Sequence, residues 1–245
     1  MSGPTAPPVV PRTATAEPRQ RWRLVVARGA DAPPASTRDL AEAWTTALEA
    51  AGLPLARTEG SRPRPKVSFG APLPVGMAAE GELIDAVLVE RWPTWRVREA
   101  LAGGLPSGWR LVDLFDVWLA GPPLPGRVAA ADYRVTLGNT PDAARIARAG
   151  AELLAAPRLP RERTKGETTI PYDLRPLLIS ITVEAGPPVV VRTRTRFHPE
   201  LGTGRPEEIV AALADRLGVA LQAESIVRER LVLLEDLDED ASRTS

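Results

Sequence analysis

Apolar residues recur at two spacings along the chain, and these spacings predict its elements. Residues 21–28, RWRLVVAR, are a short apolar run typical of a strand, whereas residues 37–50 place Leu40, Trp44 and Leu48 at helical spacing. Further strands are predicted for KVSFGAPL, GELIDAVLVE and WRLVDLFDVWL, and a second helix for TWRVREALAGGL. The first half is therefore predicted as strand, helix, strand, strand, helix, strand.

The same order of elements returns after the Pro/Gly-rich segment GPPLPGR. AADYRVTL is strand-like, TPDAARIARAGAELLAA is helical, LLISITVEA and PVVVRTRTRF form a hairpin, RPEEIVAALADRLG is an amphipathic helix and AESIVRERLVLLE is a closing strand. Each half matches the split βαβ arrangement of ferredoxin-like folds. The sequence thus predicts an α+β protein of two tandem ferredoxin-like (βαββαβ) units, with antiparallel sheets and helices on one face.

Composition sets the boundaries of these units. Residues 1–20 mix Pro, Thr and Ala without apolar periodicity, and such a segment cannot bury enough surface to offset its ordering entropy. We predict five segments: a disordered arm at 1–20, an N-terminal domain at 21–120, a linker at 121–127, a C-terminal domain at 128–235 and an acidic or polar tail at 236–245.

The residue content excludes several kinds of chemistry. The 245 residues include no cysteine and one histidine, His198, which excludes thiolate metal sites, iron–sulfur clusters, a cysteine nucleophile and a two-histidine metal site. No phosphate-binding loop or nucleophile elbow is present, and we expect neither metal nor cofactor. No apolar run reaches about 18 residues, so we expect a cytoplasmic protein without a membrane span. No oligomeric state is predicted.

Because the formal net charge is zero, binding to a polyanion would require a local basic patch. The stretch TEGSRPRPKVSFGAPLPVG offers one. Pro63 and Pro65 restrict the residues before them to extended conformations and hold Arg62, Arg64 and Lys66 outward in a stiff loop. This loop could grip phosphate or carboxylate groups. Alternatively, its cations only solvate the surface.

A second basic feature is a stripe of alternating arginines, Arg192, Arg194 and Arg196, which project from one face of a predicted strand. Such a stripe suits a phosphate backbone. The alternative is a solvent-facing side balanced by carboxylates such as Glu184 on neighbouring strands. No pair of aromatic residues interleaves with these arginines, which argues against a sheet that stacks single-stranded bases.

Other polar candidates are less specific. Arg175 lies beside Asp173 at the start of an apolar strand, as either a structural pair or a site residue. Glu82 and Asp85 are three residues apart in a strand and therefore lie on opposite faces, where they cannot form a carboxylate dyad unless a bulge intervenes. His198 is most simply a polar loop residue.

Several of these segments together resemble a known family over roughly residues 21–234. The pattern Gly-x-x-Pro-x-Pro-x-x-Ser-Phe is followed by Pro-Leu-Pro-x-Gly, by two strand carboxylates and by Asp-Leu-Arg-Pro, and it is preceded by a Ser-x-x-Asp-Leu helix start. The chain in this respect resembles the radical-SAM-associated domain family, domain of unknown function 2344. The residues that carry the resemblance are Asp39, Gly60, Pro63, Pro65, Ser68, Phe69, Pro74, Gly76, Glu82, Asp85 and Asp173.

The resemblance implies a partner, because members of this family occur alone or fused behind a cobalamin-binding radical-SAM enzyme. It implies association with a separately encoded radical-SAM enzyme, since this chain has no cysteine cluster of its own. Thr37 stands where the family has histidine, and Ser61-Arg62-Pro63-Arg64-Pro65 stands where it has Phe-Asn-Pro-His-Pro. Two histidines of the family pattern, which are suited to proton transfer, are thus replaced in this chain.

Three hypotheses about function follow. The favoured one is a non-catalytic module that binds an anionic substrate, structured RNA, and acts with a separate enzyme. The second is an enzyme that acts on a small anionic metabolite. Its substrate would be oriented by Arg62, Arg64 and Arg175, and its acid or base would be Asp39, Glu82 or Asp85. The third is a protein-binding scaffold with tryptophan-lined contacts.

Overall fold

The computed structural model of the protein describes residues 16–138, 142–166 and 168–237. The helices are α1 (Thr37–Ala50), α2 (Thr94–Ala102), α3 (Ala143–Ala155) and α4 (Pro206–Leu217), with short 3-10 turns η1 (Leu124–Arg127) and η2 (Arg175–Leu177). The strands are β1 (Gln20–Arg28), β2 (Val67–Phe69), β3 (Ala78–Leu88), β4 (Trp109–Val117), β5 (Val128–Leu137), β6 (Pro160–Lys165), β7 (Thr168–Asp173), β8 (Leu178–Glu184), β9 (Val189–His198), β10 (Gly202–Thr203) and β11 (Ala223–Leu233).

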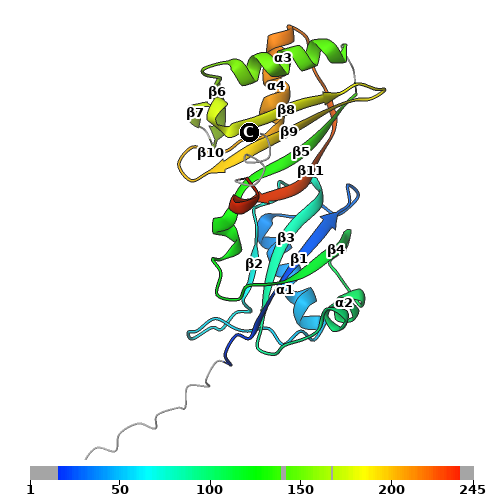
Figure 1. Cartoon of the computed structure of the whole chain (residues 1–245), viewed down its shortest axis with the longest axis vertical. Helices are drawn as coiled ribbons and strands as arrows, with labels where there is room; N and C mark the ends of the chain where they lie inside the picture. Colours follow the sequence, from blue (N-terminus) through cyan, green and yellow to red (C-terminus); the bar gives the residue numbers. More distant parts are fainter. Residues whose placement is uncertain (1–15, 139–141, 167, 238–245) are drawn as a thin grey trace, which may run out of the picture.

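One mixed sheet runs through both halves of the described chain (Figure 1). Its strands follow the order β10-β9-β5-β11-β3-β1-β4, with β2 added beside β3 and β8 beside β9. These pairs are antiparallel except for β11 with β3, which is parallel where Val227 and Arg228 meet Ala78 and Ala79. The protein is therefore an α+β fold with a mostly antiparallel mixed sheet, as the sequence predicts at this level.

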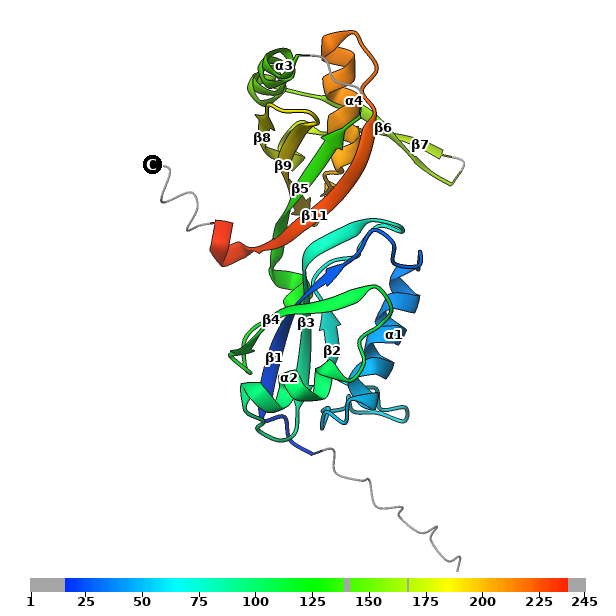
Figure 2. The same ribbon diagram turned by 90° about the vertical axis from the view of Figure 1, so that its right-hand side faces the viewer.

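Each half has its own apolar core, and a third cluster joins them. Figure 2 shows α1 beside the lower half of the sheet and α3 and α4 beside the upper half. Trp44 and Leu48 of α1 are fully buried in the first core, and Ile146 and Leu213 of α3 and α4 in the second. The joining cluster lies at the β3–β11 contact and contains Leu73, Met77, Ala79, Ala131, Tyr133 and Leu231.

The predicted linker packs against the sheet. The Arg21 guanidinium donates hydrogen bonds to the carbonyl oxygens of Leu119 (2.7 Å), Gly121 (3.0 Å) and Pro122 (3.1 Å). Leu124, in η1, is completely buried. These contacts lay residues 119–124 against the first half, and the buried Leu124 adds apolar stabilisation.

Several details differ from or add to the sequence predictions. Gln20, assigned to the arm, begins β1 and bonds to Trp92 through both its amide nitrogen and its amide oxygen. The rest of the arm up to residue 15 and the tail from residue 238 lie outside the described residues. The β6–β7 hairpin was not predicted, because its polar sequence carries no clear alternation. None of the described helices is long and apolar enough to cross a membrane.

Candidate functional site: a basic end and a cleft between the halves

The proline-rich basic loop is held in a defined shape by its own hydrogen bonds, including one to the Thr58 side chain. The Thr58 N–H donates to the Arg64 carbonyl (2.8 Å), the Arg64 N–H donates to Thr58 Oγ1 (3.0 Å), and the Lys66 N–H donates to the Ala56 carbonyl (2.7 Å). Gly60 turns the loop with φ 123°, a value that favours glycine. The loop is thus an ordered hairpin that presents its cations without further folding.

Arg62 and Arg64 are exposed and form no ion pair with any described residue, whereas Arg57 in the same loop pairs with Glu49. Lys66 is half-buried. The structure therefore exposes the guanidinium groups of Arg62 and Arg64 on this turn but half-buries Lys66, which the sequence also predicted to project outward.

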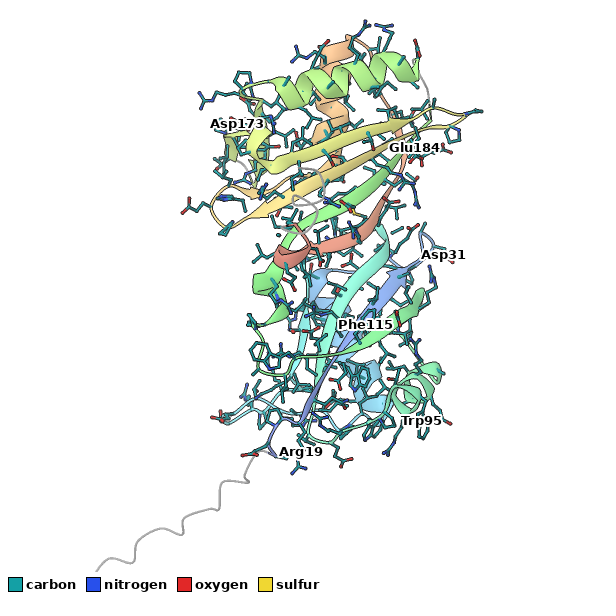
Figure 3. All side chains as sticks on the ribbon, viewed as in Figure 1. Arg19, Asp31, Trp95, Phe115, Asp173 and Glu184 are labelled. Atoms are coloured by element: carbon teal, nitrogen blue, oxygen red, sulfur yellow. The ribbon has the colours of Figure 1, made fainter. Side chains whose placement is uncertain are left out.

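Two further cations join this loop at the same end of the first half. The Arg19 N–H bonds to the Leu88 carbonyl (2.8 Å) and the Val89 N–H bonds to the Pro54 carbonyl (2.9 Å), which ties the start of β1 and the end of β3 to the loop. Arg19, labelled in Figure 3, and Arg91 are both exposed here. We call this group the basic end: Arg19, Arg62, Arg64, Lys66 and Arg91.

The basic end contains five positively charged side chains, whereas the same segments contain three carboxylates, those of Glu17, Glu59 and Glu90. Sequence reasoning missed Arg19 and Arg91 because they are distant from the loop along the chain. The strand order could have found them, since β1 starts where β3 ends in an antiparallel pair.

The arginine stripe on β9 has the predicted alternation but is mostly neutralised. Val191, Thr193 and Thr195 are buried on one face, and the arginines take the other. Arg192 pairs with Glu184 (2.5 Å) and with Glu229, and Arg194 pairs with Asp132 (2.6 Å). Arg196 is exposed and has no ion pair among the described residues. Arg192 and Arg194 therefore fit the alternative interpretation of the stripe, in which carboxylates on neighbouring strands balance the arginines.

Asp132 sits at the centre of this ladder, between Arg194 and Arg230 (2.7 Å). Burial acts to raise the pKa of Asp132, but hydrogen bonds from the two arginines outweigh it and hold that pKa below the ordinary 3.8. Because the folded-state pKa is depressed, the ladder stabilises the fold above the unfolded value. That contribution is lost as pH falls through the folded value.

We therefore expect Asp132→Asn to destabilise the protein by about 1 kcal/mol near pH 7, since the group is partly screened by solvent. The difference from wild type should shrink as pH falls from the ordinary value of 3.8 through the lower folded-state pKa, where the wild-type carboxylate becomes protonated in the folded protein. Urea unfolding of both proteins across this range measures it. A difference that stays constant with pH would contradict this assignment.

Arg175 and Asp173 brace a turn and do not form a side-chain pair. The Asp173 carboxylate accepts from the N–H groups of Leu159 (2.8 Å) and Arg175 (3.0 Å), while the Arg175 guanidinium donates to the Leu178 carbonyl (2.9 Å). Burial acts to raise the pKa of Asp173, and these backbone bonds outweigh it and lower that pKa. Both groups are therefore occupied structurally.

The remaining polar candidates also have structural partners. His198 Nδ1 accepts from the N–H groups of Glu200 (3.2 Å) and Leu201 (3.1 Å), which closes the turn between β9 and β10. The Asp39 N–H donates to Ser36 Oγ (3.2 Å), and the Asp39 carboxylate accepts from the Ser36 N–H in return (3.3 Å). This capping box explains why α1 begins with this motif.

The two strand carboxylates lie on opposite faces of β3, as predicted, and each is buried with an arginine. Asp85 pairs with Arg23 (2.8 Å). Glu82 receives two hydrogen bonds from Arg228 (2.6 and 2.5 Å), a residue of β11 in the second half. Arg228 also donates to the Pro72 carbonyl (3.0 Å) and is 1% exposed. This ion pair crosses the junction and holds the Pro-Leu-Pro-x-Gly turn in place.

That turn forms one wall of a cleft between the halves. The interhalf cleft has a volume of about 540 Å³. The first half contributes Thr37 and residues 72–75, and the second contributes Tyr133, Phe197, residues 203–208 and Arg228. The turn ends at Gly76, whose φ of 78° favours glycine. Sequence reasoning did not find this cleft, because its walls come from segments that only the tertiary fold brings together.

The predicted site residues do not converge on one place. The basic loop lies at the outer end of the first half in both Figure 1 and Figure 2, the arginine stripe lies on β9 and Arg175 lies in η2. Within the described parts of the chain, no group of three or more His, Asp or Glu side chains could hold a metal ion.

These features define an α+β protein with one mixed sheet, a basic end and a cleft between its halves. The chain belongs to the family described as an uncharacterized protein conserved in bacteria, DUF2344, whose model matches residues 21–209. This is the family that the sequence motifs resemble. No curated protein matches the chain.

Two solved structures are distantly similar in shape. A Cbf5-Nop10-Gar1 complex has a TM-score of 0.45 and 13% identity over 86% of this chain and 48% of that chain. An archaeal box H/ACA sRNP Nop10-Cbf5 complex has a TM-score of 0.42 and 13% identity over 84% of this chain and 46% of that chain. The protein spans about half the length of these chains.

Proposed function

We propose that the protein is a non-catalytic binding module for structured RNA that acts in the cytoplasm with a separate radical-SAM enzyme. The observation that carries the proposal is the basic end, where Arg62 and Arg64 are exposed, form no ion pair with a described residue and are held on an ordered hairpin. Cations that are already positioned lose little conformational entropy when they bind phosphate. Each phosphate contact also releases counterions, which favours binding at low salt.

The topology supports two ferredoxin-like units as the scaffold for this module. The first half has the antiparallel order β4-β1-β3-β2, and the second has the antiparallel order β11-β5-β9-β8. In both, the chain runs strand, helix, strand, strand, helix, strand, apart from the inserted β6–β7 hairpin and the short β10. Fold alone does not assign function, so the proposal rests on the basic end.

The enzyme alternative is weaker because its acid and base candidates are already engaged. Glu82 and Asp85 are buried in bidentate contacts with arginines, and Asp39 caps α1. A general base must reach a substrate proton with a free lone pair. Of the arginines assigned to orient a metabolite, Arg62 and Arg64 lie on the basic loop of the first half, whereas Arg175 lies in η2 of the second half.

The test is binding of labelled total cellular RNA across a salt series, for wild type and for Arg62→Ala/Arg64→Ala. Wild type should bind at low salt with an affinity that falls as salt rises. The double variant should bind more weakly, with a slope of log affinity against log salt reduced by roughly 2, one for each lost phosphate contact.

The matched control is Arg192→Ala/Arg194→Ala, which removes the same number of arginines from ion pairs with carboxylates. We expect this control to change the slope by less than the loop variant does. Absence of RNA binding at low salt would overturn the proposal. Binding that is insensitive to salt would instead favour an apolar scaffold, for which Trp95 (66% exposed) and Trp118 (76% exposed) are the accessible tryptophans.

A further inference from the structure

We propose that the interhalf cleft is a separate binding site for a nucleoside monophosphate. Its volume of about 540 Å³ lies within the range of small-molecule sites. Pro74, Val75 and Phe197 supply accessible apolar and aromatic lining suited to the flat face of a base. The site is separate from the basic end, so it stands or falls independently of RNA binding there.

The start of α4 supplies the anion-binding part of this cleft. Arg205 is the residue before the helix, it is exposed, and it forms no ion pair with a described residue. No side chain caps the first turn, and Pro206 has no N–H. The Glu208 N–H is already bonded to the Arg205 carbonyl (3.1 Å), so the Glu207 N–H and the Arg205 guanidinium are the donors that this end of the cleft offers to a phosphate group.

The cleft also offers acceptors, which narrows the class of ligand. Glu207 and Glu208 follow Arg205 in the lining and would repel a ligand that is only anionic. A nucleotide carries hydroxyl donors on its ribose that these carboxylates can accept. The base of a nucleotide thus matches the apolar wall, its sugar matches the carboxylates, and its phosphate matches the end of the cleft at Arg205.

A smaller chamber behind the cleft provides an independent polar feature. It has a volume of about 30 Å³, shares Thr37 and Leu73 with the cleft, and is also lined by Trp44 and Glu82. Trp44 is 1% exposed, and its indole Nε1 has no hydrogen-bond partner among the described residues. A buried donor without an acceptor is costly, and a ligand oxygen that reached this chamber from the cleft would supply one.

The experiment is calorimetric titration of the full chain with adenosine, guanosine, cytidine and uridine 5′-monophosphates. The key variant is Arg205→Ser, which removes the guanidinium and places a good capping residue before α4. We expect its thermal unfolding midpoint to be unchanged or higher and its nucleotide affinity to fall at least tenfold. If Arg205 had a purely structural role, the unfolding midpoint and the nucleotide affinity would fall together.

Trp44→Phe keeps a large ring and removes the Nε1–H, and we expect it to weaken nucleotide binding several-fold. Arg158→Ser is the matched control, because it removes a guanidinium that is 83% exposed and outside the cleft lining, and it should bind nucleotides as wild type does. Titration with a short single-stranded RNA bearing a 5′-phosphate distinguishes a free nucleotide from the end of a strand. If the RNA binds more tightly than the nucleotides and Arg205→Ser weakens that binding, the ligand is the end of a strand.

No binding of any of the four nucleotides at millimolar concentration would overturn the proposal. Equal binding by wild type and Arg205→Ser would also overturn it, since the phosphate would then lie elsewhere. If RNA binding at the basic end fails while nucleotide binding persists, only the proposed function is lost.

Discussion

Replacing Glu82 with alanine is expected to lower the free energy of unfolding by about 3–5 kcal/mol, because it leaves the Arg228 guanidinium buried without its counter-charge. Burial acts to lower the pKa of Arg228, but Glu82 outweighs it and keeps that pKa above its ordinary value. Without Glu82, the charged arginine retains two carbonyl acceptors, at Pro72 and Ala71. Urea unfolding of both proteins measures the loss.

Two controls separate the buried charge from general effects of substitution. Glu49→Ala removes a carboxylate from the exposed Arg57 pair and should change stability by less than about 1 kcal/mol. Replacing both buried partners, Glu82→Leu with Arg228→Met, should recover much of the loss because no unpaired charge remains. A Glu82→Ala protein as stable as the Glu49→Ala protein would show that the junction is not held in this way.

Gly81→Ala should destabilise the protein by about 1–3 kcal/mol through overpacking at the junction. A Cβ at this position would lie 2.8 Å from the Glu229 carbonyl oxygen and 3.3 Å from the Arg230 Cα. Both atoms belong to the backbone of β11, which cannot rotate away as a side chain can. The parallel contact of β3 with β11 would therefore have to open.

Chemical denaturation gives the loss, and hydrogen exchange at residues 78–82 locates it, since opened strands exchange faster. Gly104→Ala is the matched control, because a Cβ there meets nothing within 4 Å. This control should be neutral or slightly stabilising, as alanine restricts the unfolded chain more than glycine does. Equal stability of the two variants would argue against a tight β3–β11 contact.

Both predictions concern the way in which the two halves form one structure. The parallel β3–β11 contact, the Glu82–Arg228 ion pair and the shared apolar cluster lie at the same junction. The same ion pair fixes the turn that lines the interhalf cleft, through the Pro72 carbonyl. Stability of the junction and shape of the cleft are therefore linked, and Glu82→Ala is also expected to alter nucleotide binding.

The sequence by itself determined the elements, because each depends on local spacing. Helical spacing located α1 and α4, alternation located β9 with its arginines on one face, and the prolines around Arg62 and Arg64 indicated a stiff exposed loop. The motif also identified the family, since its residues lie in a few short segments. The unpredicted β6–β7 hairpin is the exception, because polar strands lack an apolar signal.

Only the tertiary structure decided which charges are free and which are paired. Arg192 and Arg194 look like Arg62 and Arg64 in sequence, but Glu184, Asp132 and Glu229 reach the former from neighbouring strands. Strand order likewise buried Glu82 against Arg228, 146 positions away. Local spacing cannot report such contacts, because the energy of a charge depends on its partners and burial in three dimensions. The interhalf cleft was beyond sequence reasoning for the same reason, as its walls meet only in the folded sheet.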